Sequence, residues 1–233
     1  MKAKKSCIAI IPARSGSKRI KNKNIKKFFN KPIIYYPIKT ALKSKCFDEV
    51  HVSTNSKKIA NLATQFGAKV PILRPKKLSK DNSSTISVIN HYIKYLNKEK
   101  KKFDFVCCIY PTSVFVKAKH IISAYKKLKN KKLNYVFTVS QFPQPIERSF
   151  TIKKSKVYQP MKKKYILSRS NYLKKKYFDA GQFYFGKTSS FKKNKLVFSR
   201  GSGVIEIDKY KSIDINDNKD WEIAKTIFKK LKF

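Results

Sequence analysis

The stretch Ile10–Asn24 reads IIPARSGSKRIKNKN, and it decides how the rest of the chain is interpreted. It begins inside an apolar run, Cys7–Ile11, which predicts a buried strand. The strand leads directly into a loop that carries Gly16 and several lysines and arginines, with no acid between Met1 and Ser44. Glycine lets a backbone approach a ligand closely, and cations neutralise phosphate charge. The stretch therefore predicts a phosphate site at the end of the first strand.

The length and composition indicate one globular unit. A chain of 233 residues with 41% apolar content is long enough to bury a sizeable core. No uninterrupted apolar run approaches the roughly 20 residues that a bilayer span needs, so we expect no membrane partner. The basic, apolar N-terminus is too short for a secretion signal and is interpreted as a core strand, which favours a cytoplasmic location. We expect a single domain over residues 1–233.

The formal charge of +43 is the most unusual bulk property of the chain. Fifty of its 56 cationic side chains are lysines, and they are spread along the whole length. Proteins that bind nucleic acids usually concentrate positive charge on one face. We therefore interpret the charge as the lysine-rich surface of an enzyme and expect no specific nucleic-acid partner. A basic nucleic-acid-binding protein remains the alternative from another functional class.

Short apolar runs alternate with segments of helical periodicity. The predicted strands are Cys7–Ile11, Glu49–Ser53, Lys69–Ile72, Phe105–Ile109 and Tyr135–Val139, and the predicted helices between them are Lys31–Ser44, Ser56–Phe66, Ser84–Asn97 and Val116–Asn130. Such alternation predicts an α/β fold, a mainly parallel sheet with helices on both faces. Ligands bind such sheets at the carboxyl ends of the strands.

The segment from Gln141 to Tyr177 breaks this alternation. It holds prolines, two triple-lysine runs and scattered aromatic residues, and we interpret it as a β-hairpin arm used for dimer contact. The α/β pattern resumes at Gly181–Phe185 and Gly203–Ile207, and a last helix is predicted over Asn218–Lys232.

The loop after the first strand resembles the first motif of the CMP-sialic acid synthetase family, written IPARxGSKxxxxKN. The matching residues are Ile11, Pro12, Ala13, Arg14, Gly16, Ser17, Lys18, Lys23 and Asn24. The motif is neither a Walker A sequence nor a GxGxxG fingerprint. The resemblance implies that CTP is bound by Ala13, Arg14, Ser17, Lys18, Lys23 and Asn24. It also implies that Arg14 and Lys18 are catalytic cations.

Two further segments resemble the family in the same order along the chain. VSTNS at Val52–Ser56 follows the second predicted strand, and RPKKLSKDNSST at Arg74–Thr85 precedes the third helix. The resemblance implies that Asn55, Arg74, Asp81 and Ser84 also line the CTP site. Without the resemblance, the last two of these residues would be interpreted as helix caps, and both roles are compatible.

Three segments resemble the pseudaminic acid branch of the family: CCIYPTS at Cys107–Ser113, FPQPIER at Phe142–Arg148 and DAGQFYF at Asp179–Phe185. In the first, a tyrosine stands where sialate synthetases usually have glutamine. The resemblance implies sugar contacts from Tyr110, Pro111, Thr112, Gln144, Arg169, Gln182 and Tyr184. Among these, Arg169 is the candidate to bind the sugar carboxylate, from across a dimer interface. Strand alternation places Phe183 and Phe185 in the core and Gln182 and Tyr184 on the opposite face.

The segment SIDINDNKD at Ser212–Asp220 resembles the acidic pair that holds Mg²⁺ in this family. Asp214 matches the first acid, and Asn216 stands in place of the second. The resemblance implies that both residues hold Mg²⁺ and that Asp214 is catalytic. A turn and helix cap at Asp217 is the alternative interpretation of the segment, and an inactive family member is a further one.

Together, these segments imply a Rossmann-like nucleotide-diphospho-sugar transferase fold with a dimerisation arm. The implied reaction joins CMP from CTP to a nine-carbon 2-keto sugar acid and releases pyrophosphate. The branch features favour pseudaminic acid as the sugar. N-acetylneuraminate, legionaminate and a deoxy-octulosonate remain alternatives.

Overall fold

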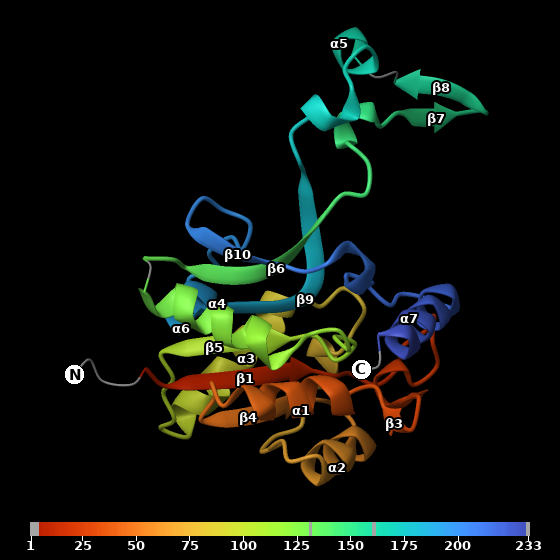
Figure 1. Cartoon of the computed structure of the whole chain (residues 1–233). Helices are drawn as coiled ribbons and strands as arrows, with labels where there is room; N and C mark the ends of the chain where they lie inside the picture. Colours follow the sequence, from red (N-terminus) through yellow and green to blue (C-terminus); the bar gives the residue numbers. More distant parts are fainter. Residues whose placement is uncertain (1–4, 131, 160–161, 232–233) are drawn as a thin grey trace.

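The computed structural model describes residues 5–130, 132–159 and 162–231, and it is built around a six-stranded sheet (Figure 1). The strand order is β10-β6-β9-β5-β1-β4. The strands are β1 (Cys7–Pro12), β4 (Glu49–Ser53), β5 (Phe105–Ile109), β6 (Tyr135–Gln141), β9 (Tyr177–Lys187) and β10 (Ser202–Glu206). Of the strands predicted from the sequence, all except Lys69–Ile72 are therefore present in this sheet.

Strand β9 is the exception to an otherwise parallel sheet. β1 pairs in parallel with β4 and β5, and β6 pairs in parallel with β10, whereas β9 is antiparallel to both of its neighbours. Residues Gly181–Phe185, predicted to resume the α/β pattern, lie within β9, which is longer than that segment and antiparallel to both neighbouring strands. The chain leaves the sheet at the end of β6 and returns through the arm to the strand position beside it, so β9 runs antiparallel to β6.

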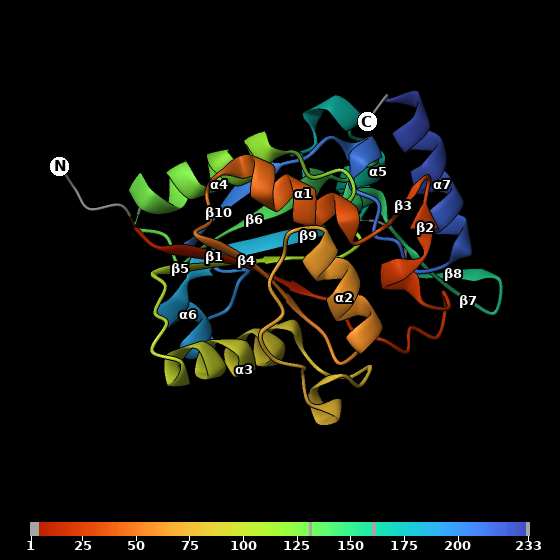
Figure 2. The same cartoon turned by 90° about the horizontal axis from the view of Figure 1, so that it is seen from below.

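Helices cover both faces of the sheet, as predicted (Figure 2). The helices on one face are α1 (Tyr35–Ser44), α2 (Lys57–Gln65) and α4 (Ala118–Asn130), and those on the other are α3 (Thr85–Lys98) and α6 (Thr188–Lys192). Alternation along β1 produces the two cores, because Cys7, Ala9 and Ile11 pack on the α1 side while Ile8 and Ile10 pack on the α3 side. Each buried isoleucine contributes on the order of 2 kcal/mol.

Helix α7 (Asn218–Lys230) joins the C-terminal segment to the region after the first loop. Its Trp221 and Phe228 pack edge-on against Phe28, at ring-centroid distances of 5.5 and 5.2 Å. Phe28 belongs to a two-stranded ribbon of β2 (Lys27–Phe28) and β3 (Lys31–Pro32). Asp217 caps α7, as the sequence indicated.

Some predicted boundaries were wrong. Lys69–Ile72 is no strand and contributes only the bridge His51–Lys69, with a second bridge from Thr54 to Leu73, because Pro71 has no backbone N–H to continue a ladder. The helix predicted from Lys31 begins at Tyr35, after β3, and the one predicted from Val116 begins at Ala118. Helix α7 ends at Lys230, and the predicted end at Lys232 lies outside the described residues.

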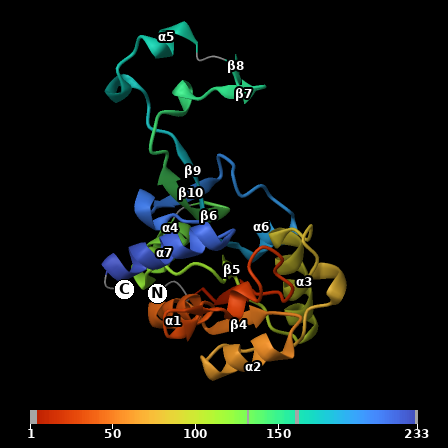
Figure 3. The ribbon, with the colours of Figure 1, turned by 90° about the vertical axis from the view of Figure 1, so that its right-hand side faces the viewer.

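The arm, residues 142–176, stands away from the sheet on the two chain segments that continue β6 and β9 (Figure 3). It holds the predicted hairpin, β7 (Thr151–Lys153) with β8 (Lys156–Gln159), as well as α5 (Lys163–Ile166). Short 3₁₀ turns lie at Lys23–Ile25, Lys76–Leu78, Ile146–Arg148, Ser170–Tyr172 and Lys209–Lys211. Among the described helices, none is long and apolar enough to cross a bilayer.

Candidate active site

A cavity of about 310 Å³ lies at the carboxyl ends of β1 and β5, where a ligand of such a sheet is expected. We call it the sheet-end cavity. Its walls combine the first loop, the start of α3, the turn after β5 and the segment before α7. They are formed by Pro12, Arg14, Ser17, Lys23, Asn24, Arg74, Ser83, Thr85, Val88, Tyr110, Pro111, Thr112, Asp214 and Asn216. The structure therefore brings together residues from four of the predicted motifs.

The first loop is held in place by hydrogen bonds from neighbouring segments. The Ala13 N–H donates to the Ser53 carbonyl at 2.9 Å. Asn55 accepts from the Ser15 N–H and donates to the Ser15 hydroxyl, both at 2.9 Å. The Asn24 amide donates to the Arg14 carbonyl at 2.8 Å. Of the predicted CTP-binding residues, Ala13 and Asn55 therefore support the loop and do not line the cavity.

A second cavity, of about 280 Å³, is lined by residues of the same loop. We call it the loop cavity. Its walls carry four cationic side chains and one acid, and they are formed by Arg14, Ser17, Lys18, Arg19, Ile20, Lys23, Asp81 and Asn216. Such a concentration of positive charge around a small space favours a phosphate-bearing ligand.

The acid of the loop cavity, Asp81, pairs with two of its cations. Its carboxylate accepts from Arg14 and forms an ion pair with Lys18 at 3.2 Å. The hydrogen bonds from Lys18 and Arg14 lower the pKa of Asp81 below its usual value. Because Lys18 is 84% exposed, its ammonium is held only weakly and is accessible to an incoming anion.

Arg74 is a buried cation with unused hydrogen-bonding capacity. It is only 5% exposed, and its Nε donates to the Ser79 hydroxyl at 3.2 Å. One terminal nitrogen is buried with no hydrogen-bond partner among the described residues. Burial, together with nearby Arg14, lowers the pKa of Arg74 to about 10, so the side chain stays charged at neutral pH. A buried donor without a partner in a cavity wall favours an acceptor on the ligand.

Asp214 and Asn216 face these cations from the other wall. The Asn216 amide nitrogen donates to the Asp214 carboxylate at 2.8 Å, and its oxygen accepts from Arg19 at 3.0 Å. Lys23 donates to the Ile215 carbonyl at 2.7 Å. Burial lowers the pKa of Lys23, while Asp214 acts in the opposite direction.

The residues present fit a divalent metal held mainly by its substrate. No group of three metal-binding side chains occurs within the described part of the chain. Mg²⁺, however, needs only one or two carboxylates when substrate phosphates supply the other oxygens, and Asp214 is an exposed carboxylate on the cavity wall. The Asn216 oxygen, predicted as the second ligand, accepts the hydrogen bond from Arg19 in this structure.

A pair of tyrosines, Tyr110 and Tyr184, lies between the sheet-end cavity and a larger one. The hydroxyl of Tyr110 lies 2.9 Å from the Thr85 hydroxyl, and the Tyr184 hydroxyl donates to Asp179. The two rings meet edge to face at 5.6 Å, and burial raises the pKa of Tyr110 to about 12. Both phenols are thus neutral hydrogen-bonding groups at physiological pH.

The larger cavity, about 760 Å³, is called the outer cavity. It shares Thr85 and Tyr110 with the sheet-end cavity, and its remaining walls are Ser84, Ile86, Ser87, Tyr184, Asn194, Lys195, Leu196, Val197 and Phe198. Ser84 also caps α3 by accepting from the Ser87 N–H at 3.2 Å, as the sequence indicated. The predicted alternation along β9 is confirmed, since Phe183 lies in the main core and Tyr184 on the opposite face.

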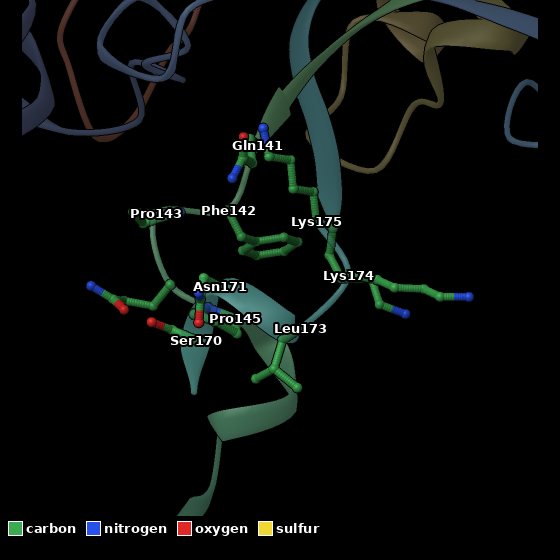
Figure 4. A pocket seen from close by; sticks show the side chains of 11 residues that line it. Gln141, Phe142, Pro143, Pro145, Ser170, Asn171, Leu173, Lys174 and Lys175 are labelled. Carbon is green, nitrogen blue, oxygen red and sulfur yellow. The ribbon is translucent and has the colours of Figure 1, made fainter. Parts of the chain in front are cut away.

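The remaining predicted sugar contacts lie elsewhere in a single copy of the chain. Gln182 is 2% exposed, and its amide nitrogen donates to the Ala180 carbonyl. Gln144 lines a cavity of about 320 Å³ at the root of the arm, where Figure 4 shows the ring of Phe142 between the segments that enter and leave. Arg169 is exposed on the arm. These three residues therefore do not join the sheet-end cavity within one copy.

Sequence reasoning missed several residues of the cavity walls. Ser83, Thr85 and Val88 line the sheet-end cavity, and Arg19 lines the loop cavity. Arg19 belongs to the cationic loop, and Ser83 and Thr85 belong to the quoted segment RPKKLSKDNSST, so these residues carried a visible signal, whereas Val88 carried none. Asp179 was part of a quoted motif, but its bond to the Tyr184 hydroxyl depends on the folding of β9.

Known proteins resemble the chain in sequence and in structure. A sequence model of the cytidylyltransferase family matches residues 8–200. A pseudaminic acid cytidylyltransferase of Campylobacter jejuni is 36% identical over 222 residues, which cover 95% of this chain and 96% of that protein. A longer Helicobacter pylori protein, named for pseudaminic acid cytidylyltransferase and for a hydrolase, is 42% identical over 209 residues, 89% of this chain and 40% of its own length.

A solved structure has the same fold at low sequence identity. It is a CMP:2-keto-3-deoxy-manno-octonic acid synthetase complexed with CTP, with a TM-score of 0.70 and 13% identity. The match covers 97% of this chain and 99% of that one. The likeness confirms the fold class that the motifs implied.

Proposed function

The chain belongs to the cytidylyltransferase family, and from that premise we propose that it transfers CMP from CTP to the anomeric hydroxyl of a nonulosonic acid, pseudaminic acid first among them. The observation that carries the proposal is the pair of cavities that share the first loop, one bordered by Arg74 and Tyr110 and the other by four cationic side chains. CTP requires these two environments side by side, one for its nucleoside and one for its triphosphate.

We place the triphosphate along the loop cavity and the nucleoside in the sheet-end cavity. Arg14, Lys18 and Lys23 supply positive charge for the phosphates. The buried, unpartnered nitrogen of Arg74 offers a donor to the nucleoside or to its nearest phosphate. Binding replaces the Asp81 carboxylate with phosphate oxygens at Arg14 and Lys18, so these cations exchange one anionic partner for another.

The chemistry requires alignment and charge neutralisation more than covalent help. The anomeric oxygen forms a bond to the α-phosphorus while the bond from that phosphorus to the β-phosphate bridging oxygen breaks. The electron pair of the broken bond leaves with pyrophosphate, and the hydroxyl proton passes to water. A divalent metal bound by Asp214 and the phosphates would neutralise charge and acidify the hydroxyl. Arg14 and Lys18 stabilise the growing negative charge.

The sugar acid is proposed to enter through the outer cavity and to meet the tyrosine pair. Tyr110 borders both cavities, so a sugar that contacts it lies beside the α-phosphate. Pro111 and Thr112 complete this wall. The choice of pseudaminic acid is supported by the names of the two relatives described above.

We further propose that the chain works as a homodimer in the cytoplasm. The arm exposes large apolar side chains, including Ile152 at 68% and Leu167 at 76%, which a second copy would cover. Arg169 and Gln144 lie on or near the arm, and a second copy's arm would bring them toward the sugar carboxylate.

A panel of sugar acids tests the proposal. The purified chain is mixed with CTP and Mg²⁺, and pyrophosphate release is measured with pseudaminate, N-acetylneuraminate, N,N′-diacetyllegionaminate and deoxy-octulosonate. We expect kcat/KM to be highest for pseudaminate by at least 10-fold. Preference for another acid would overturn the choice of sugar, and folded protein that binds RNA at physiological salt but not CTP would overturn the enzyme.

A further inference from the structure

Arg19 connects the first loop to the segment before α7. Its guanidinium donates to the Asn216 amide oxygen at 3.0 Å, across 197 residues of sequence. The nitrogen of the same amide donates to the Asp214 carboxylate at 2.8 Å. A carboxylate at position 216 would accept from Arg19 but would have no proton to donate to Asp214. The amide therefore allows one side chain to orient a cation and an anion at once.

Arg19 has no acidic partner among the described residues, unlike its neighbours. Arg14 and Lys18, on the same cavity wall, both pair with Asp81. Arg19 forms no ion pair within residues 5–130, 132–159 and 162–231, and Asn216 contributes a neutral acceptor. The guanidinium keeps several N–H donors for another partner, and its orientation is set before a ligand arrives.

We propose that Arg19, oriented by Asn216, is a further catalytic residue that contacts the β- and γ-phosphates of CTP and the departing pyrophosphate. The inference rests on the proposed function, because it assigns a role within that reaction. When the bond between the α-phosphorus and the bridging oxygen breaks, the electron pair stays on pyrophosphate. A fixed cation at that end of the loop cavity stabilises the transition state more than the bound substrate.

Asn216 acts in this proposal as a positioning residue. Its oxygen holds Arg19, so it acts on the phosphates through the guanidinium and not as a ligand of the metal. The proposal thus gives the asparagine at this position a function of its own, in place of the second metal-binding acid that the sequence motif implied.

The first test compares Arg19→Ala with Lys21→Ala. Lys21 is an exposed cation two residues away that lines none of the described cavities. Lys21→Ala therefore removes one positive charge, as Arg19→Ala does, but removes no proposed contact with the phosphates. Calorimetry measures inorganic pyrophosphate binding without metal, and steady-state kinetics measure turnover. For Arg19→Ala we expect pyrophosphate binding about 10-fold weaker and kcat about 10- to 100-fold lower. For Lys21→Ala we expect both within about 2-fold of the original chain.

A double-mutant cycle tests the role of Asn216. Asn216→Ala should weaken metal-free pyrophosphate binding less than Arg19→Ala does, and the double variant should bind no more weakly than Arg19→Ala alone. Arg19→Lys keeps the charge but loses the planar fork, so it should restore part of the affinity. Melting temperatures check that each variant is folded.

The outcomes separate this inference from the proposed function. If the original chain neither binds nor turns over CTP, the proposed function fails. If it turns over CTP, but Arg19→Ala and Lys21→Ala bind pyrophosphate equally well, the inference about Arg19 is overturned. Additive losses in the double-mutant cycle would overturn the positioning role of Asn216.

Discussion

The first loop and the arm are both rich in cations, but they are stabilised in different ways. The loop is held by Asn55, which comes from another segment and accepts from the Ser15 N–H, and by the bond from Asn24 to the Arg14 carbonyl within the loop itself. In the arm, the hairpin strands pair with each other, and large apolar side chains such as Ile152 are exposed. The loop is thus complete in one copy of the chain, whereas the arm has an apolar surface that a partner would cover.

This difference assigns separate contributions to the two regions. A preorganised loop can bind phosphates without rearrangement of its backbone, which is the main requirement of nucleotidyl transfer. An arm that depends on a second copy makes its contribution depend on protein concentration. Variants in the two regions should therefore differ in how their effects respond to dilution.

The largest effect is expected at the loop. Lys18→Ala should lower kcat/KM for CTP by about 100-fold or more, because a cation that faces the phosphates is lost, and dilution should not change the ratio. The melting temperature should stay within about 1 °C, since an 84% exposed lysine contributes little to stability. Pyrophosphate release and thermal melting check both expectations. Near-normal turnover would remove Lys18 from the site.

The next effect is expected at the arm. The double change Ile152→Ser with Val157→Ser removes two exposed apolar side chains from the hairpin and should shift a dimer toward monomer, with activity about 10-fold lower at dilute protein. Sedimentation measures the mass. The matched control is Ile223→Ser, which removes a 53% exposed isoleucine from α7 in the body. Equal masses for both variants would show that the hairpin forms no interface.

A smaller effect is expected at the tyrosine pair. Tyr184→Phe removes the hydroxyl that donates to Asp179 and loosens the ring packed against Tyr110. We expect KM for the sugar acid to rise about 5- to 10-fold, on the order of 1 kcal/mol, while KM for CTP stays unchanged. Tyr210→Phe, at a 62% exposed position, serves as the control. A rise in KM for CTP would indicate that the tyrosine wall supports the nucleotide instead.

The sequence predicted best what lies close together along the chain. The strand β1, the loop after it and the caps at Ser84 and Asp217 depend on neighbouring residues, and the structure has them as expected. The antiparallel direction of β9 was not predicted, because alternation of side chains is the same in parallel and antiparallel strands.

Contacts between distant segments were beyond the reach of pattern reasoning. The hydrogen bond between Arg19 and Asn216 joins positions 197 residues apart, and no local sequence pattern predicts it. The hydrogen bond from the Tyr184 hydroxyl to Asp179 likewise depends on an irregular pairing of β9 with β6. Such contacts depend on how strands pair and how distant segments pack, and one sequence does not reveal either.

The last expected effect is on the stability of the body and not on activity, at a position far along the sheet from the site. Glu49, at the start of β4, accepts from Lys69 at 2.9 Å and Lys101 at 3.2 Å and is bonded to buried His51 at 2.6 Å. Burial alone would raise the pKa of Glu49, but these partners lower it from its ordinary value of 4.5 to about 2. Burial lowers the pKa of His51 as well, against the opposing effect of Glu49.

Both shifts make the body less stable in acid. The carboxylate of Glu49 stabilises the fold above pH 4.5, and that contribution, on the order of 3 kcal/mol, is lost as the pH falls toward 2. The unfolded chain protonates His51 near pH 6.5, before the folded chain does, so stability also declines below that pH. Glu49→Gln should lower the melting temperature at pH 7 and flatten its decline between pH 4.5 and 3. The melting temperatures of the variant and of the original chain should approach each other as the pH falls, because protonation removes the contribution of ionised Glu49. A constant difference between the two melting temperatures over this range would contradict the assignment.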